Sequence, residues 1–157
     1  MDDYMDYTCG VTGMNKITDE QANTVIEKVR QAAEQAIRAG YKYFWLALIG
    51  TASVHYATGV KEAINGHDGV TLELMIPYPH WKDKMLSPEQ YKQVTQNTDG
   101  SMYVDNFPIS DIMMLTNNRV LDLATRMIIV SDGKDKEAQS IIKIARDIET
   151  PVTVISP

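Results

Sequence analysis

The sequence predicts an α/β fold in which a doubly wound, mostly parallel sheet carries helices on both faces, within a single domain. Predicted strands and helices alternate almost throughout the chain, and strands joined through helices form right-handed crossovers in parallel sheets. The predicted strands are also nearly continuous apolar runs, which is typical of strands buried on both faces. At 157 residues, 44% of them apolar, the chain holds one sizeable core but not two ordinary domains.

The first strand is predicted at residues 7–12, and a helix follows it. Thr18 and Gln21 open this helix as a capping box. Apolar residues then recur at helical spacing until Gly40, which supplies the left-handed geometry common just past a helix end.

A central strand is predicted at residues 41–49, an aromatic and aliphatic run without polar alternation. The small residues 50–53 break that run and open a second helix at 54–64. Residues 70–77 predict a third strand. It ends at Pro77, because proline has no N–H to donate to the hydrogen bonds between strands. A long loop is expected next, carrying Tyr78, His80 and Trp81.

Ser87, followed by proline and then Gln90, predicts the start of a short helix that ends near Gln96. Ser110 is expected to cap a later helix that extends to Ala124. The other predicted elements are strands at 102–104, 126–130 and 151–155 and a helix at 136–148.

Composition and charge exclude several classes of protein. The longest apolar stretch, residues 43–49, is too short to span a membrane, and the acidic start at residues 1–3 is unlike a signal peptide, so a cytoplasmic protein is expected. The net charge is −6 with scattered basic residues, which predicts against nucleic acid as the main partner. Cys9 is the only cysteine, so it is expected to be buried, and no metal site or cofactor is expected.

Glycine and hydroxyl residues follow several predicted strands, where the ligand crevice of an open parallel sheet lies. Glycine allows close approach of the backbone to a phosphate, and a helix N-terminus adds partial positive charge. We therefore expect Gly13, Gly50 and Gly133 to converge on one rim; the alternative is that they only make tight turns. The predicted ligand-binding residues are Thr12, Gly13, Gly50, Thr51, Tyr78, Asn117, Asp132 and Gly133.

The aromatic loop has two interpretations. Tyr78, His80 and Trp81 either form a wall for a base or ribose or fold back on the sheet with Trp81 as the anchor. Asn117 and Asp122 lie on one predicted helix, where they either contact a ligand or serve as solvated or capping residues.

Several segments form a recognisable order of motifs: residues 11–13, 50–52 and 76–79 with Trp81 and Tyr91, Asn117 with 121–122, and 129–133. Together they resemble the SLOG superfamily of Rossmann-like nucleotide binders, specifically its YpsA-type branch. The resemblance covers residues 11–155 and implies one Rossmann-like domain over 1–157 with a nucleotide or ADP-ribose-like ligand. The chain departs from the branch at Met14, Tyr56, Thr116 and residues 134–136.

Three functions compete on this basis. The first is binding of a nucleotide-like ligand without turnover. The second is an N-glycosidase or deoxyribosyl transferase, which would need Asp122 or Asp132 as its catalytic carboxylate. The third is a protein-interaction role, such as a viral inhibitor, on a degenerate scaffold; the departures from the branch favour it. Adjacent Met113 and Met114 also raise the prospect of a homodimer through their helix.

Overall fold

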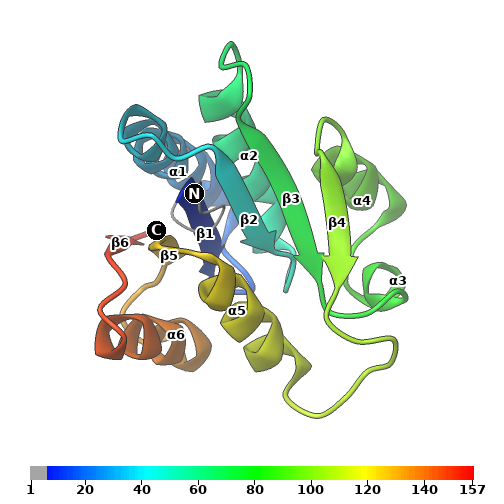
Figure 1. The fold of residues 1–157 in the computed structure, drawn as a ribbon. Coiled ribbons are helices and arrows are strands. Elements are labelled where there is room, and N and C mark those ends of the chain that lie inside the picture. Colours follow the sequence, from blue (N-terminus) through cyan, green and yellow to red (C-terminus); the bar gives the residue numbers. More distant parts are fainter. Residues whose placement is uncertain (1–6) are drawn as a thin grey trace.

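The computed structural model describes residues 7–157 and places six parallel strands in one sheet, in the order β4-β3-β2-β1-β5-β6 (Figure 1). The strands are β1 (Thr8–Gly13), β2 (Tyr43–Ala47), β3 (Thr71–Ile76), β4 (Gly100–Tyr103), β5 (Arg126–Val130) and β6 (Val152–Ile155). The helices are α1 (Asp19–Arg38), α2 (Ala52–Ile64), α3 (Trp81–Met85), α4 (Pro88–Thr95), α5 (Ile112–Leu123) and α6 (Lys136–Asp147). The predicted single-domain α/β fold with a doubly wound parallel sheet is confirmed.

The strand order reverses between β1 and β5. The chain builds outward from β1 through β2 and β3 to β4, then crosses to the other side of β1 to form β5 and β6. All five strand pairs are parallel, so the carboxyl ends of the strands share one edge of the sheet. Ligands of such sheets bind outside this edge, at the point where the order reverses.

Two apolar layers cover the sheet, and β2 shows how the sequence builds both. Phe44 and Leu46 pack into the cluster that includes α1 and α2, whereas Trp45 and Ala47 pack into the cluster that includes α5 and α6. Successive side chains of a strand point to opposite faces, so an unbroken apolar run is what a strand between two helical layers requires. Cys9 is fully buried in the first cluster, as expected, and burial raises the pKa of its thiol to about 12.

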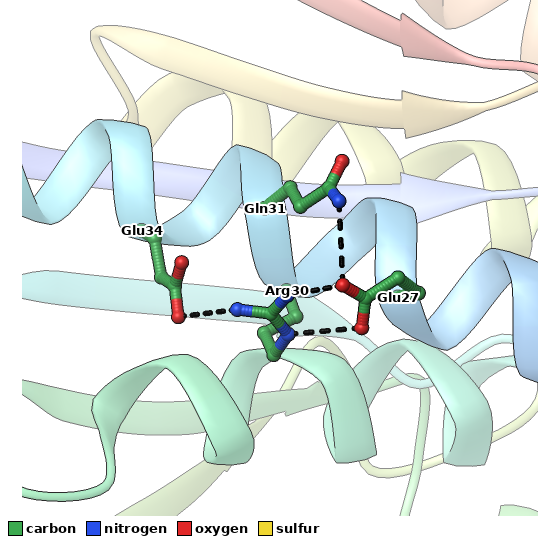
Figure 2. Close-up of polar contacts among 4 residues, drawn as sticks. All are labelled: Glu27, Arg30, Gln31 and Glu34. Atoms are coloured by element: carbon green, nitrogen blue, oxygen red, sulfur yellow. Dashed lines mark hydrogen bonds and ion pairs between the residues drawn. The ribbon is translucent and has the colours of Figure 1, made fainter.

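The outer part of α1 carries a network of charged and polar side chains, drawn in Figure 2. The Arg30 guanidinium bonds Glu27 and also Glu34, at 2.6 Å from Nη1 to Oε1. Gln31 donates a further bond to Glu27 at 3.3 Å. These hydrogen bonds raise the pKa of Arg30 and lower that of Glu27. Spacings of three and four residues place these groups on one helix face, where such pairs support the helix modestly.

Three details of the sequence prediction were wrong. The expected loop after β3 contains the short helix α3, because Trp81 is buried in the core and the chain coils around it. Ser110 does not cap α5; Asp111 precedes the helix in a left-handed conformation, with φ of 58°, and turns Ile112 into the core. The central strand ends at Ala47 rather than at residue 49, since the N–H of Ile49 bonds to the Ser53 hydroxyl instead of a strand.

Gly59 permits the close contact between α1 and α2. A Cβ atom at this position would lie 2.7 Å from the carbonyl oxygen of Ile26 and 2.9 Å from Cβ of Val29, both on α1. Alanine stabilises a helix interior by about 1 kcal/mol relative to glycine. The presence of glycine at position 59 therefore indicates that close packing of the two helices outweighs helix propensity there.

We predict that Gly59→Ala lowers the free energy of unfolding by about 1–3 kcal/mol, because the added methyl group forces α1 and α2 apart. Urea denaturation measures this change. Gly100→Ala is the matched control, since a Cβ at Gly100 meets its nearest neighbour at an ordinary 3.5 Å. A Gly59→Ala protein as stable as the wild type would show that this contact is loose.

Candidate functional site

Three connections meet at the carboxyl edge of the sheet, around the point where the strand order reverses. They are the β1–α1 loop, the β2–α2 turn and the β5–α6 loop. The N–H of Met14 bonds to the carbonyl of Val130 at 3.0 Å, and the N–H of Ala52 bonds to the carbonyl of Asn15 at 3.0 Å. The β1–α1 loop therefore bridges the other two connections.

The β1–α1 loop rests on the N-terminal end of α2. A Cβ atom at Gly50 would collide with the backbone of Asn15, so only glycine allows this seating. The hydroxyl of Tyr56 donates to the carbonyl of Met14 at 2.7 Å from within the core. Burial raises the pKa of Tyr56, and the negative charge of Asp135 raises it further. Tyr56 thus stays a neutral donor that fixes the loop.

The β2–α2 turn presents hydrogen-bond donors that the described residues leave unused. The Ser53 hydroxyl accepts from Ile49 N–H at 3.2 Å and donates to the Ala47 carbonyl at 3.1 Å, which fixes the turn. Thr51 precedes α2 without capping it, and neither its N–H nor that of Gly50 has a partner among residues 7–157. The N-terminus of a helix carries about half a positive charge, so this turn favours an anion.

Asn15 also links the loop to α6 through its side chain. Its Nδ2 donates to Oε2 of Glu137 at 3.3 Å. Its Oδ1 is buried and has no hydrogen-bond partner. A buried acceptor without a donor costs about 1–3 kcal/mol, so the Asn15 side chain holds the loop at some cost to stability.

The β5–α6 loop uses its backbone N–H groups internally. Oδ1 of Asp132 accepts from the N–H of Lys134 and of Asp135, both at 2.8 Å, and these bonds hold the pKa of Asp132 below its usual range. Asp135 in turn caps α6 by accepting from Ala138 at 3.0 Å. Gly133 adopts φ of 82° in this turn, which favours glycine. The loop therefore already holds carboxylates where an external anion would bind.

Thr12, Gly13 and Asn117 lie at this edge but are engaged with the protein. The Thr12 hydroxyl bonds to Oδ1 of Asn117, and both residues are buried. A Cβ at Gly13 would lie 2.6 Å from the carbonyl oxygen of Val130, so glycine is needed there for β1 to approach β5. These contacts give the three residues a role in holding β1, β5 and α5 together.

Tyr78 and Asp122 lie away from the three connections. Tyr78 is buried in the core, with its ring edge-on to Trp81 at 5.8 Å between centroids, which matches the packing interpretation of this segment. Asp122 is exposed near the end of α5, just before β5 begins, and so belongs to the opposite, amino edge of the sheet. Of the predicted residues, Gly50, Thr51, Asp132 and Gly133 remain at the site surface or in its walls.

Sequence reasoning missed Asn15, Tyr56 and Glu137. Asn15 lies in the loop that the sequence pointed to, but its link to Glu137 spans 122 residues and leaves no trace in local spacing. In the sequence, Tyr56 stood out only because it departs from the pattern of the YpsA-type branch. In the structure its hydroxyl donates to the Met14 carbonyl and so holds the β1–α1 loop.

A separate groove, with a cavity volume of about 780 Å³, opens at the amino edge. It lies between the C-terminal ends of α2 and α4 and includes Lys61, Asn65 and Gln96. Lys61 is not free there, because its Nζ donates to the carbonyls of Gln93 and Val94 at 2.8 and 3.0 Å. Among residues 7–157, no cluster of three metal-ligating side chains occurs. None of the helices in that part of the chain is long and apolar enough to cross a membrane.

Comparisons with known proteins show likeness of fold. No family model matches the chain, and no curated protein sequence matches it. The solved Moco carrier protein of Chlamydomonas reinhardtii is 16% identical with a TM-score of 0.59, over 97% of this chain and 78% of that one. DNA processing protein A of Streptococcus pneumoniae is 14% identical with a TM-score of 0.62, over 95% of this chain and 50% of that one.

A third solved structure is DNA processing protein A of Helicobacter pylori, described for its single-stranded DNA binding mode. It is 16% identical with a TM-score of 0.58, over 94% of this chain and 64% of that one. At such identities the likeness shows the fold alone. The chain therefore has a Rossmann-like fold, in agreement with the fold that the SLOG resemblance implies.

We predict that Tyr56→Phe loosens the β1–α1 loop, because the half-buried Met14 loses the donor to its carbonyl. The free energy of unfolding should fall by about 1–2 kcal/mol, and amide hydrogen exchange should accelerate at residues 14–17. Tyr103→Phe, at an exposed tyrosine of β4, is the control and should change neither quantity. Unchanged exchange in Tyr56→Phe would mean that the loop is held without this bond.

Proposed function

We propose that this chain binds a small phosphate-bearing, nucleotide-like ligand at the carboxyl edge of its sheet, with the anion on the β2–α2 turn. The observation that carries the proposal is the N-terminus of α2, where the N–H groups of Gly50 and Thr51 and the Thr51 hydroxyl have no partner among the described residues. By comparison, α1, α4 and α6 are each capped by a side chain of their own, whereas α5, which begins after the edge strand β4 and not beside the reversal of strand order, also lacks a side-chain cap. An uncapped helix start beside a reversal of strand order is where phosphates bind in such folds.

The nucleotide-like class rests on the resemblance to the SLOG superfamily, and membership of that superfamily and of its YpsA-type branch forms part of this proposal. The structural neighbours support a binding role, since one is a carrier of the molybdenum cofactor and another binds single-stranded DNA. Against nucleic acid as the main partner stands the net charge of −6. A cytoplasmic location stays a prediction.

The geometry favours binding over N-glycosidic cleavage. Asp122 lies at the opposite edge of the sheet from the β2–α2 turn. Asp132 is held ionised by two backbone N–H groups, so it is a poor source of a proton for a leaving base. Neither carboxylate is placed as a general acid beside the proposed anion position.

Calorimetry should detect binding of at least one ligand from a panel of inorganic phosphate, AMP, ADP-ribose, cyclic ADP-ribose and a single-stranded oligonucleotide. Thr51→Val should weaken the best ligand about tenfold, because one charge-assisted hydrogen bond is lost while shape is kept. Thr150→Val, at a partly buried threonine before β6, should leave affinity unchanged. No heat with any ligand at millimolar concentration would remove the proposal, and chromatographic release of base would replace it with the glycosidase.

A second candidate function, association with a second copy or another protein, has its own observation. Large apolar side chains are exposed on and after the edge strand β4. They are Met102, Tyr103, Phe107, Ile109 and Leu115. Phe107 is 70% exposed, and β4 has a strand neighbour on one side only. Exposed apolar side chains on and near an open sheet edge are typical of an interaction surface.

If this surface forms a homodimer, light scattering should give twice the mass of the chain. Phe107→Ser should restore the mass of a single chain, since it removes the most exposed apolar group of the set. The matched control is Ile148→Ser, which removes another exposed apolar side chain, at the end of α6. A wild-type protein that is monomeric at every concentration would contradict the homodimer.

A further inference from the structure

A small pocket opens between α3 and the start of α4. Its cavity volume is about 280 Å³, and it is lined by Lys82, Asp83, Leu86, Ser87, Pro88 and Tyr91. Leu86, Pro88 and the Tyr91 ring give it an apolar part beside its polar residues. Sites for drug-sized ligands measure about 300–1,000 Å³, so the size of this pocket suits one side chain of a partner better than a whole small molecule.

The most exposed large apolar side chain among residues 7–157 lies in the loop next to this pocket, but outside it. Phe107 is 70% exposed and is not part of the pocket lining. The N–H of Asp105, in the same loop, donates to the Pro77 carbonyl at 3.1 Å, and Pro77 leads through residues 78–80 into α3. The β4–α5 loop and α3 therefore share one corner of the molecule, beyond the end of β4 (Figure 1).

The β4–α5 loop holds the Phe107 ring in this exposed position. Oδ1 of Asp105 accepts from the N–H of Asn106 at 2.7 Å and from the N–H of Phe107 at 3.2 Å. Pro108 follows, and proline restricts the residue before it to extended conformations. The backbone is thus constrained on both sides of Phe107, and an aromatic ring is presented to solvent. Aromatic side chains that fill a pocket of the partner are the usual anchors of protein interfaces.

The charges around Phe107 and around the pocket complement each other. Residues 104–111 contain Asp105 and Asp111 and no basic residue, whereas residues 81–92 contain three lysines and two carboxylates. The Nζ atom of Lys82 lies 4.4 Å from the centroid of the Tyr91 ring, at the pocket. None of Lys82, Asp105 and Asp111 takes part in an ion pair among the described residues. The acidic loop of a second copy therefore fits the pocket that contains this lysine.

We propose that Phe107 of one chain fills the α3–α4 pocket of a second copy, and that Phe107 of the second copy fills the pocket of the first. The ring packs against Leu86 and Tyr91, and Asp105 faces Lys82 across the contact. A two-fold axis generates both contacts at once, because each chain then offers the same surface to the other. The inference rests on the homodimer that is the second candidate function above, and it adds the site that receives Phe107.

Analytical ultracentrifugation measures the dissociation constant of the dimer and tests the pocket separately from the dimer. Tyr91→Ser removes the aromatic wall of the pocket and should raise the dissociation constant about tenfold or more. Lys82→Glu places a carboxylate opposite Asp105 and should act in the same direction; it is the second variant if Tyr91→Ser fails to fold. The matched control is Lys92→Glu, an exposed lysine of α4 outside the pocket lining, which should change the constant less than about twofold.

A mixture of two variants tests the pairing of ring and pocket most sharply. Phe107→Ser keeps the pocket and lacks the ring, whereas Tyr91→Ser keeps the ring and lacks the pocket wall. A mixed pair retains one complete contact, and each variant alone retains none. With one variant fluorescently labelled, the mixed dimer should therefore be tighter than the dimer of either variant.

The outcomes separate this inference from the homodimer itself. A wild-type dimer whose dissociation constant is unchanged by Tyr91→Ser and by Lys82→Glu would overturn the pocket contact and leave the homodimer standing. A mixed dimer no tighter than those of its components would also overturn it, because Phe107 would then contact something other than the pocket. A wild-type chain that is monomeric at every concentration would remove both.

Discussion

The hydrogen bond from Ala52 N–H to the Asn15 carbonyl, at 3.0 Å, holds the whole carboxyl edge in its arrangement. It occupies one of the free N–H groups at the start of α2 and places the β1–α1 loop over Gly50. The Tyr56 hydroxyl, on α2, holds the same loop by donating a hydrogen bond to the Met14 carbonyl. One loop is therefore hydrogen-bonded to both α2 and β5, which fixes the relative positions of the β1–α1, β2–α2 and β5–α6 connections.

The free hydrogen-bond donors of this edge lie at the start of α2. Thr51 has an N–H and a hydroxyl without a partner among the described residues, whereas the amide of Asn15 is bonded to Glu137. The β5–α6 loop, where residues 134–136 depart from the resembled branch, bonds its own Lys134 and Asp135 N–H groups to the Asp132 carboxylate. The free donors of the β2–α2 turn therefore support the proposed anion position better than Gly133 does.

Local pattern was enough to predict the fold and the turn on which the proposed anion position rests. The strand and helix periodicities gave the parallel sheet, and a glycine followed by threonine after a buried strand identified the β2–α2 turn. Long-range contacts could not be predicted in this way: Thr12 pairs with Asn117 across 105 residues, and Asn15 with Glu137 across 122. Tyr78 was assigned to two opposite roles because an aromatic residue after a strand serves equally well in a core or in a pocket.

The central claim is that the unused donors at the start of α2 hold the anion of a nucleotide-like ligand. A crystal structure of the protein grown with AMP tests it most directly. The account predicts phosphate density against the N–H groups of Gly50 and Thr51. Density for the nucleotide in the groove between α2 and α4 at the opposite edge, with the carboxyl edge empty, would contradict it.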